Sequence, residues 1–355
     1  MSPSEPSEAP ASLAIVAGPV EERLRSILDT ERSRWVAVDG DLAGPLQILG
    51  RFVLDGGKRL RPAFCHWAFV GAGGAHDDPK VIDAGAAFEL LHAFALVHDD
   101  VMDGSSMRRG APTVHIAFAA DHARGSWNGE SRRYGEGVAI LIGDLAEVYA
   151  DRLMSDAGPS AFAVWNELKI ELNIGQFLDV LGAARGQVDL ETARRIVRYK
   201  SGKYTIERPL HVGAALAGRL DALAAPLSRY GEPLGEAFQL RDDILGTFGD
   251  SVRTGKPVGD DLREGKPTPL LAVATERSTP QQRTILDRIG SSDLELDDVL
   301  AIQSVFIETG ALSAIEADIS SLTRAAIDAL DDVEIVTEAR NALEELAHYV
   351  GDRDG

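Results

Sequence analysis

The sequence of 355 residues contains a single cysteine, Cys65. An intrachain disulfide is therefore excluded, and a reducing compartment, the cytoplasm, is expected. Aromatic residues are also scarce at 6%, and no apolar run approaches the roughly 18 residues of a membrane-spanning helix. The polar N-terminal stretch lacks the basic and apolar regions of a signal peptide. We expect a protein that does not span a membrane, with a disordered tail over residues 1–15.

Positive charge is in short supply as well. Lys and Arg number 36 against 56 Asp and Glu, which gives a formal net charge of −20. This balance excludes a nucleic acid or an anionic membrane as a partner held by general attraction. A small anionic substrate remains compatible with the sequence, because a local cluster of Lys and Arg can overrule the global sign.

Strand patterns and internal repeats are absent, and helical patterns dominate. Apolar residues recur at spacings near 3 and 4, and residues 83–103 are apolar on nearly every face, as in a central buried helix. The C-terminal part, from Leu294 to Tyr349, predicts three amphipathic helices. We therefore predict an all-α fold, a bundle of many helices in a single domain over residues 16–355. Gly-rich polar loops are predicted at 121–137 and at 249–269, the second as a candidate lid.

The predicted central helix ends in a cluster of acidic residues, within LLHAFALVHDDVMDG. Asp99 and Asp103 lie four positions apart and share a helix face, with Asp100 beside them. Three carboxylates this close repel one another unless a cation lies between them or the helix end is fully solvated. Mg²⁺ suits such oxygen ligands, and it often bridges carboxylates to substrate phosphates. This motif alone leaves the solvated alternative open.

A second acidic pair ends another apolar helix, within FQLRDDILG. Asp242 and Asp243 at this end and the first acidic motif could face one another across one cavity. Such an arrangement would hold a cluster of Mg²⁺ ions rather than a single ion.

Basic residues surround these acidic motifs in the sequence. They are Lys58, Arg59 and Arg61 after a Gly-Gly turn, Arg108 and Arg109, Lys200 and Lys203, and Lys256 and Lys266. Each of them alone could be an ordinary solvated surface charge. Together, Mg²⁺ with Arg and Lys side chains is the combination that binds diphosphate groups. His92 lies two helical turns before Asp99 on the same face, so it is a candidate for the same cavity.

Eight blocks in a fixed order resemble the trans-isoprenyl diphosphate synthases (polyprenyl synthetases) over roughly residues 20–350. The blocks are GGKRLRP, LLHAFALVHDDVMD, RRGAPTVH, GDLA, GQFLD, YKSGKYT, FQLRDDILG and GKPVGDDLREGK. The resemblance implies the isoprenoid synthase bundle around a central cavity, three Mg²⁺ ions per active site and a homodimer. It also implies head-to-tail condensation of an allylic diphosphate (dimethylallyl, geranyl or farnesyl) with isopentenyl diphosphate.

The resemblance also implies roles for individual residues. Mg²⁺ is held by Asp99 and Asp103 with support from Asp100, and by Asp242 with Asp243 beside it. The allylic diphosphate is held by Arg108, Lys200 and Lys256, with help from Lys266. The diphosphate of isopentenyl diphosphate is held by Lys58, Arg61, His92 and Arg109. Gln239 and Ser201 line the allylic side, close to the developing cation.

The sequence departs from the family pattern at two positions. Many members have Asp at the fifth position of the second acidic motif, where this chain has Gly246, and Asp250 could partly substitute for it. The family's Lys-Thr pair is Lys200-Ser201 here, which keeps a hydroxyl group. Both departures indicate subfamily variation, although Gly246 leaves the coordination of the third metal ion undetermined.

Product length follows pocket depth in this family, where a bulky residue five positions before the first Asp forms the floor. Here that residue is Phe94, followed by Ala95. Helical geometry does not derive this, because Phe94 lies about 140° around the helix from Asp99. The resemblance favours geranylgeranyl diphosphate (C20), with farnesyl diphosphate (C15) as the alternative. A deeper floor at Leu91 or Phe88 also remains open.

The motifs argue against four other functions. A class I terpene cyclase would need a different metal motif on the second helix. A non-catalytic synthase subunit would normally lack the first acidic motif, which is intact here. A phosphohydrolase built on His98-Asp99 would leave the second acidic pair and the basic residues without a role, and a helical scaffold protein would explain none of the motifs.

Overall fold

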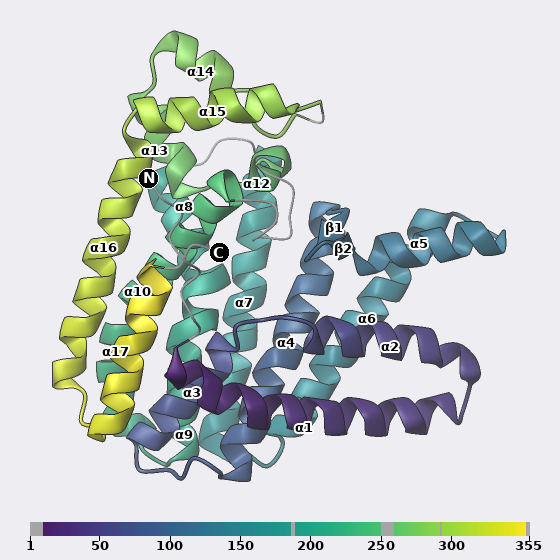
Figure 1. Cartoon of the computed structure of the whole chain (residues 1–355), viewed down its shortest axis with the longest axis vertical. Coiled ribbons are helices and arrows are strands. Elements are labelled where there is room, and N and C mark those ends of the chain that lie inside the picture. The colour runs from purple at the N-terminus through teal and green to yellow at the C-terminus, as the bar shows by residue number, and fades with distance from the viewer. Residues whose placement is uncertain (1–9, 186–188, 250–258, 292, 353–355) are drawn as a thin grey trace.

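The computed structural model describes residues 10–185, 189–249, 259–291 and 293–352, and this part of the chain is almost entirely helical (Figure 1). The α-helices are α1 (Ala11–Val36), α2 (Ala43–Leu54), α3 (Leu60–Gly71), α4 (Pro79–Asp103), α5 (Val114–Gly125), α6 (Ser131–Met154), α7 (Pro159–Arg185), α8 (Leu190–Val197), α9 (Arg208–Leu216), α10 (Leu220–Phe248), α12 (Asp260–Glu264), α13 (Pro269–Arg277), α14 (Pro280–Leu286), α15 (Leu296–Glu308), α16 (Ala311–Ala329) and α17 (Thr337–Asp352). The predicted all-α class is confirmed.

Shorter elements connect these helices. Two 3-10 turns, η1 (Gly40–Leu42) and η3 (Leu330–Asp332), and a π-helix, η2 (Arg198–Glu207), interrupt the α-helical series. A two-stranded antiparallel ribbon of β1 (Met107–Arg108) and β2 (Ala111–Pro112) follows α4. Wide π-helical turns often mark functional sites, and η2 carries the predicted Lys200 and Ser201.

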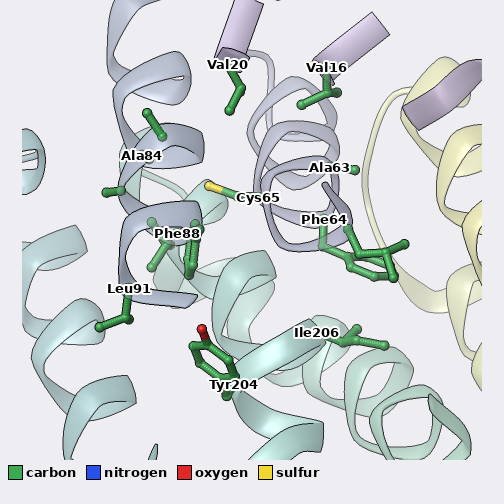
Figure 2. Packing of buried hydrophobic residues seen from close by; sticks show 14 of the residues in the cluster. Val16, Val20, Ala63, Phe64, Cys65, Ala84, Phe88, Leu91, Tyr204 and Ile206 are labelled. Carbon is green, nitrogen blue, oxygen red and sulfur yellow. The ribbon is translucent and has the colours of Figure 1, made fainter. Parts of the chain in front are cut away.

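Helix α4 lies in the interior of the bundle and packs against α1, α3, α6 and α9. Its start is fixed by Asp78, whose side chain accepts a hydrogen bond from the Lys80 backbone N–H, and its end by Gly104 in the left-handed conformation. Apolar side chains of α4 meet those of α3 and η2 in the main core (Figure 2). Packing of the apolar side chains of α4 in the core therefore fixes the position of its acidic C-terminal end.

A second apolar cluster lies toward the C-terminal part of the chain. It joins the C-terminal half of α10 to α12, α13, α14, α15 and α16. Helices α14 and α15 lie at the opposite end of the bundle from α1 (Figure 1). The predicted three helices between Leu294 and Tyr349 are present as α15, α16 and α17. Because Leu240 and Ile244 of α10 belong to this cluster, the acidic pair Asp242 and Asp243 between them is held by it.

Two boundary predictions are wrong. The disordered tail does not extend to residue 15, because α1 begins at Ala11 and buries Ser12 and Leu13. The predicted loop over 121–137 shrinks to residues 126–130, because α5 and α6 extend into it from both sides. Only His122 and Gly135 are buried at these ends, and the rings of His122 and Tyr134 lie 5.2 Å apart across the shortened loop. Within the predicted loop 249–269, residues 260–264 form α12, and residues 250–258 lie outside the described ranges.

Helix α4 corrects a further expectation, that no segment approaches the length of a membrane span. By length and composition α4 could cross a membrane, and α15 with α16 passes the same test as a pair bent by 64°. In α4, 67% of the apolar window is buried inside the bundle. The apolar residues of α4 are thus mostly buried against other helices, as in the core helix of a helical bundle.

We predict that His66 makes stability depend on pH. Its side chain is buried beside His76, with His66 Nε2 3.0 Å from His76 Nδ1, and burial, then the charge of His76, lowers the pKa of His66 from 6.5 to about 4. The unfolded chain therefore binds more protons below pH 6.5, so the free energy of unfolding should fall as pH falls. Between pH 7 and pH 5 the loss should be about 2 kcal/mol.

Urea unfolding at pH 7 and pH 5 measures this loss. His66→Gln should flatten the dependence, whereas His348→Gln, at an exposed histidine, should leave it unchanged. An equal slope in the His66 variant would contradict the assignment.

Candidate active site

A cavity of about 810 Å³ lies between the acidic ends of α4 and α10 and the loop before α3. Its volume is typical of a small-molecule site. Of the predicted site residues, the lining includes Lys58, Arg61, His92, Asp99, Arg108, Arg109, Lys200, Ser201, Gln239, Asp242, Asp243 and Lys266. The prediction that Asp99 and Asp242 face one cavity is confirmed.

The three carboxylates at the end of α4 have different surroundings. Asp99 Oδ1 accepts a hydrogen bond from Lys200 Nζ at 3.0 Å, and Asp100, which is 1% exposed, pairs with Arg108 at 2.7 Å. Asp103 Oδ2 lies 3.7 Å from Lys266 Nζ. Lysine and arginine thus offset part of the repulsion that the sequence predicts among these carboxylates.

The pKa values of Asp99 and Asp103 are driven apart. Burial raises the pKa of Asp99, but the charges of Lys200, Lys266 and Arg108 outweigh it and hold the pKa below its usual range. Burial, together with the charge of Asp99, raises the pKa of Asp103 to about 7. The end of α4 therefore carries less than its full negative charge near neutral pH.

The acidic end of α10 is more deeply buried. Asp243 is 6% exposed and accepts a hydrogen bond from Gln239 Nε2 at 2.8 Å. Burial raises the pKa of Asp243 to about 8, the hydrogen bond from Gln239 opposes the rise, and the charges of Asp261 and Asp242 add to it. A bound cation would reverse this shift, because it favours the ionised form.

Lys200 reaches the cavity from the π-helix η2. The backbone of Lys200 packs closely on Gly175 of α7, where a Cβ atom would lie 2.4 Å from the Lys200 nitrogen. From there its ammonium group lies 2.5 Å from Asp179 Oδ2, and Gln176 Nε2 donates to Asp99 Oδ1 at 2.8 Å. Sequence reasoning assigned no role to Gln176 or Asp179. Their spacing on one face of an apolar helix is the signal that could have identified them.

The loop before α3 forms the basic wall of the cavity. Gly56 and Gly57 adopt φ values of +90° and +102°, which only glycine reaches easily. Arg61 donates to Thr205 Oγ1 at 2.9 Å, and Arg109 donates to the Asp55 carbonyl at 2.8 Å. Lys58 lies 5.5 Å from the ring centre of Tyr349. Basic side chains from the loop (Lys58), the start of α3 (Arg61) and the turn between β1 and β2 (Arg109) therefore line one wall of the cavity.

Arg59 does not point into this basic wall as a free cation. Its guanidinium is buried and pairs with Glu89 of α4, while Nη1 donates to the Val53 carbonyl at 3.1 Å and Nη2 to the Leu54 carbonyl at 3.4 Å. Lys203 likewise turns away and pairs with Glu171 at 2.8 Å. Two basic residues in the predicted clusters are thus structural partners of buried glutamates.

His92 lines the cavity as predicted from its spacing to Asp99. Its Nδ1 atom is buried and makes no hydrogen bond. Burial, followed by the charges of Arg61 and Arg109, lowers the pKa of His92 well below its usual value. His92 is therefore a neutral imidazole that offers one donor and one acceptor.

The remaining predicted residues lie elsewhere. The lining of the 810 Å³ cavity includes neither Phe94 and Ala95 nor the predicted metal ligands Asp100 and Asp103. The Phe94 ring lies 4.7 Å from the His98 ring, whose Nε2 lies 3.0 Å from the Ile140 carbonyl of α6. This placement agrees with the angle of Phe94 around α4 relative to Asp99. Lys256 and Asp250 lie outside the described residues.

The donor set fits magnesium. Buried oxygens of Asp103 and Asp243 accept no hydrogen bond, and such hard oxygen donors suit Mg²⁺. In the part of the chain that the structure describes, no three His, Cys, Asp or Glu side chains form a ready-made metal centre. Mg²⁺ needs only one or two carboxylates when substrate phosphates supply the other ligands, so the arrangement agrees with a site completed by a diphosphate.

Comparisons with known proteins agree with this chemistry. The family model for polyprenyl synthetase matches residues 46–305. A geranylfarnesyl diphosphate synthase of Aeropyrum pernix is 35% identical over 84% of this chain and 91% of its own length. A nonaprenyl diphosphate synthase of Mycobacterium tuberculosis is 30% identical over 94% and 92%.

Among solved structures, a geranylgeranyl pyrophosphate synthase of Corynebacterium glutamicum, complexed with isoprenyl diphosphate and magnesium, superposes with a TM-score of 0.90. It is 38% identical, and the match covers 96% of this chain and 99% of that one. The fold, the paired acidic helix ends and these matches together show that the chain belongs to the polyprenyl synthetase family of trans-prenyltransferases.

Proposed function

We propose that the chain condenses an allylic diphosphate with isopentenyl diphosphate, head to tail, and that geranylgeranyl diphosphate (C20) is its main product. One observation carries the reaction type. Asp99 and Asp242 end two apolar helices and line the same cavity as Lys58, Arg61 and Arg109. The cavity thus combines a side suited to metal ions with a side suited to a second diphosphate.

The acidic side of the cavity takes the allylic diphosphate. Asp99, Asp103 and Asp242 would hold a cluster of three Mg²⁺ ions, with Asp100 and Asp243 supporting them. When bound, Mg²⁺ neutralises the charge that develops on the leaving diphosphate. Lys200, Arg108 and Lys266 add fixed positive charge on the same side, which lowers the barrier to carbon–oxygen cleavage.

The basic wall takes isopentenyl diphosphate. Positive charge for the diphosphate of isopentenyl diphosphate comes from Lys58, Arg61 and Arg109. His92, which lines the same cavity and is neutral, would donate a hydrogen bond to that diphosphate. The alkene of isopentenyl diphosphate then attacks the allylic cation, and a proton is lost to the departed diphosphate. Gln239 and Ser201 line the cavity, and we assign them to the allylic side, close to the developing cation.

Water must be kept out while the cation exists. Leu96 is the apolar side chain that α4 contributes to the cavity lining, beside Glu89, His92 and Asp99. The loop over residues 249–269, which the sequence predicts as a lid, stays our proposed closure, and its residues 250–258 lie outside the described ranges. Lys256 in that loop stays a predicted ligand of the allylic diphosphate.

Product sizing tests the proposal. The purified chain should convert dimethylallyl, geranyl or farnesyl diphosphate with isopentenyl diphosphate and Mg²⁺ to mainly C20 product, and chelation of Mg²⁺ should stop the reaction. The relatives named geranylfarnesyl and nonaprenyl diphosphate synthase are named for products longer than C20, so the assay must measure product length. Farnesyl diphosphate is the alternative product. Inactivity of the chain alone would contradict the proposal and favour a non-catalytic subunit.

We predict that Phe94→Ala lengthens the product. Phe94 is half-buried, packs against the main core and lies beside His98, outside the lining of the cavity. The prediction therefore follows from the family resemblance: removal of this ring would let the cavity extend along α4 and accept further isoprene units. Product chain length, measured by chromatography, should increase by at least one C5 unit. Phe162→Ala, at a partly exposed phenylalanine of α7, should leave it unchanged. An unaltered product in the Phe94 variant would place the floor deeper, at Leu91 or Phe88.

We also propose a homodimer formed through α6 and α7. These helices expose large apolar side chains at helical spacing, namely Leu141 and Val148 on α6 and Ile170, Ile174 and Phe177 on α7. Lys169 and Asp151, paired at 2.7 Å, connect the two helices. Monomeric proteins rarely expose so many large apolar groups together, and a second copy would cover them.

Leu141→Asp should therefore convert the dimer to a monomer. Leu141 is 67% exposed in the isolated chain, and a buried unpaired carboxylate at an interface is costly. Sedimentation velocity measures the mass, and Val336→Asp, an exposed site away from α6 and α7, is the control. A wild-type chain that sediments as a monomer would refute the interface.

Two further proposals rest on the sequence. We treat the chain beyond its tail as one polyprenyl synthetase domain, and we place it in the cytoplasm because its single thiol, Cys65, is fully buried and unpaired.

A further inference from the structure

The second acidic motif lacks one carboxylate. Gly246 stands four positions after Asp242 on α10, so the two positions share a helix face at the cavity. An aspartate at position 246 would place a third carboxylate beside Asp242 and Asp243. The residue that replaces this carboxylate must come from elsewhere in the fold.

Asp261 of α12 occupies the space that Gly246 leaves open. A Cβ atom at Gly246 would lie 1.7 Å from Asp261 Oδ2 and 2.5 Å from its Cγ. Both distances are far below van der Waals contact, so Asp261 can adopt this position only because residue 246 is glycine. A carboxylate therefore lies directly against α10 at the position that the motif lacks.

Helix α12 is held firmly enough to present this carboxylate. Leu262 is 4% exposed and packs into the second apolar cluster. Glu264 Oε1 accepts a hydrogen bond from Ser105 at 2.8 Å, just beyond the end of α4. The helix is thus fixed between the two acidic ends, and Asp261 lines the same cavity as Asp99 and Asp242.

Two observations indicate that this position receives a cation. Asp243 is 6% exposed, and its Oδ2 atom is buried without a hydrogen bond in the same cavity. The Lys266 ammonium group lies 3.3 Å from Asp261 Oδ1 and 3.7 Å from Asp103 Oδ2, so a positive charge already bridges the two acidic ends. A buried carboxylate oxygen without a donor is a ready metal ligand.

We propose that Asp261 supplies the third carboxylate of the second acidic cluster, in place of the side chain that Gly246 lacks, and helps hold the magnesium ion bound by Asp242. This inference rests on the proposed function, because it assumes that Mg²⁺ and a diphosphate bind in this cavity. It assigns the missing carboxylate to α12 rather than to residues further along α10.

Binding of Mn²⁺ in the presence of inorganic diphosphate, followed by electron paramagnetic resonance, tests the proposal without turnover. Asp261→Asn keeps the shape of the side chain and should weaken Mn²⁺ binding about 10- to 100-fold, the usual effect of losing a ligand-supporting group. Combining Gly246→Asp with Asp261→Gly moves the carboxylate to α10 and should restore binding. Asp297→Asn, at an exposed residue of α15, is the matched control and should bind like the wild type.

Unchanged Mn²⁺ binding in Asp261→Asn would overturn the inference, and so would a folded double variant that fails to regain binding. If the double variant does not fold, Asp261→Ala should reproduce the loss, and wild-type binding in that variant would overturn the inference. Failure of the wild type itself to bind Mn²⁺ with diphosphate would instead overturn the proposed function, together with the inference built on it.

Discussion

Replacing Asp99 with asparagine should lower kcat by about 10²- to 10³-fold, the usual effect of removing one preorganised charge-stabilising group. Asp99 is the α4 carboxylate that lines the cavity, and its low pKa keeps it ionised. Asparagine has the same shape but binds Mg²⁺ weakly, so the leaving diphosphate would lose part of its neutralising charge.

The fold should survive this change. Lys200 keeps its ion pair with Asp179 at 2.5 Å, and Gln176 can still contact a side-chain oxygen at position 99. We expect the melting temperature to stay near that of the wild type while steady-state kinetics with isopentenyl diphosphate show the loss in kcat. Asp144→Asn, at a half-exposed residue of α6, is the control with full activity. A kcat near the wild-type value in Asp99→Asn would remove Asp99 from the metal site.

Replacing Glu89 with glutamine should destabilise the protein by about 3–5 kcal/mol, the usual cost of leaving one partner of a buried ion pair alone. Glu89 and Arg59 have side chains that are 6% and 3% exposed. The guanidinium would keep the Val53 and Leu54 carbonyls but lose its buried counter-charge. Arg59 is the residue with φ of +54° that joins the Gly-Gly turn to α3, so its position sets that of the basic wall.

Urea unfolding measures the stability change, and KM for isopentenyl diphosphate measures the position of the wall. Glu21→Gln is the matched control, because Glu21 lies 3.5 Å from Arg59 at a partly exposed site and should contribute less than about 1 kcal/mol. The double replacement Arg59→Met with Glu89→Leu should recover stability, since apolar pairs often replace buried ion pairs without loss. It should still raise KM for isopentenyl diphosphate. Equal stability of Glu89→Gln and the wild type would show that the pair is not needed.

The sequence motifs are sufficient to predict the fold class and most of the residues that line the cavity. Apolar spacing predicts helices because burial of one face is a local property of the sequence, and α4, α10 and the C-terminal helices follow it. The first and last residues of the helices are less predictable from the sequence. The start of α1 at Ala11 depends on the burial of Leu13 against distant helices, which no local pattern reveals.

The sequence by itself determined the ingredients of the site: two Asp-tipped apolar helices, a Gly-Gly turn with basic residues and a histidine two turns before Asp99. Only the tertiary structure decided which of these ingredients meet. It turned Arg59 toward Glu89, placed Lys200 between Asp99 and Asp179, and brought Asp261 against Gly246. The physical reason is that charge pairing depends on distances of a few ångströms between segments far apart in the chain, and packing of the apolar core sets those distances.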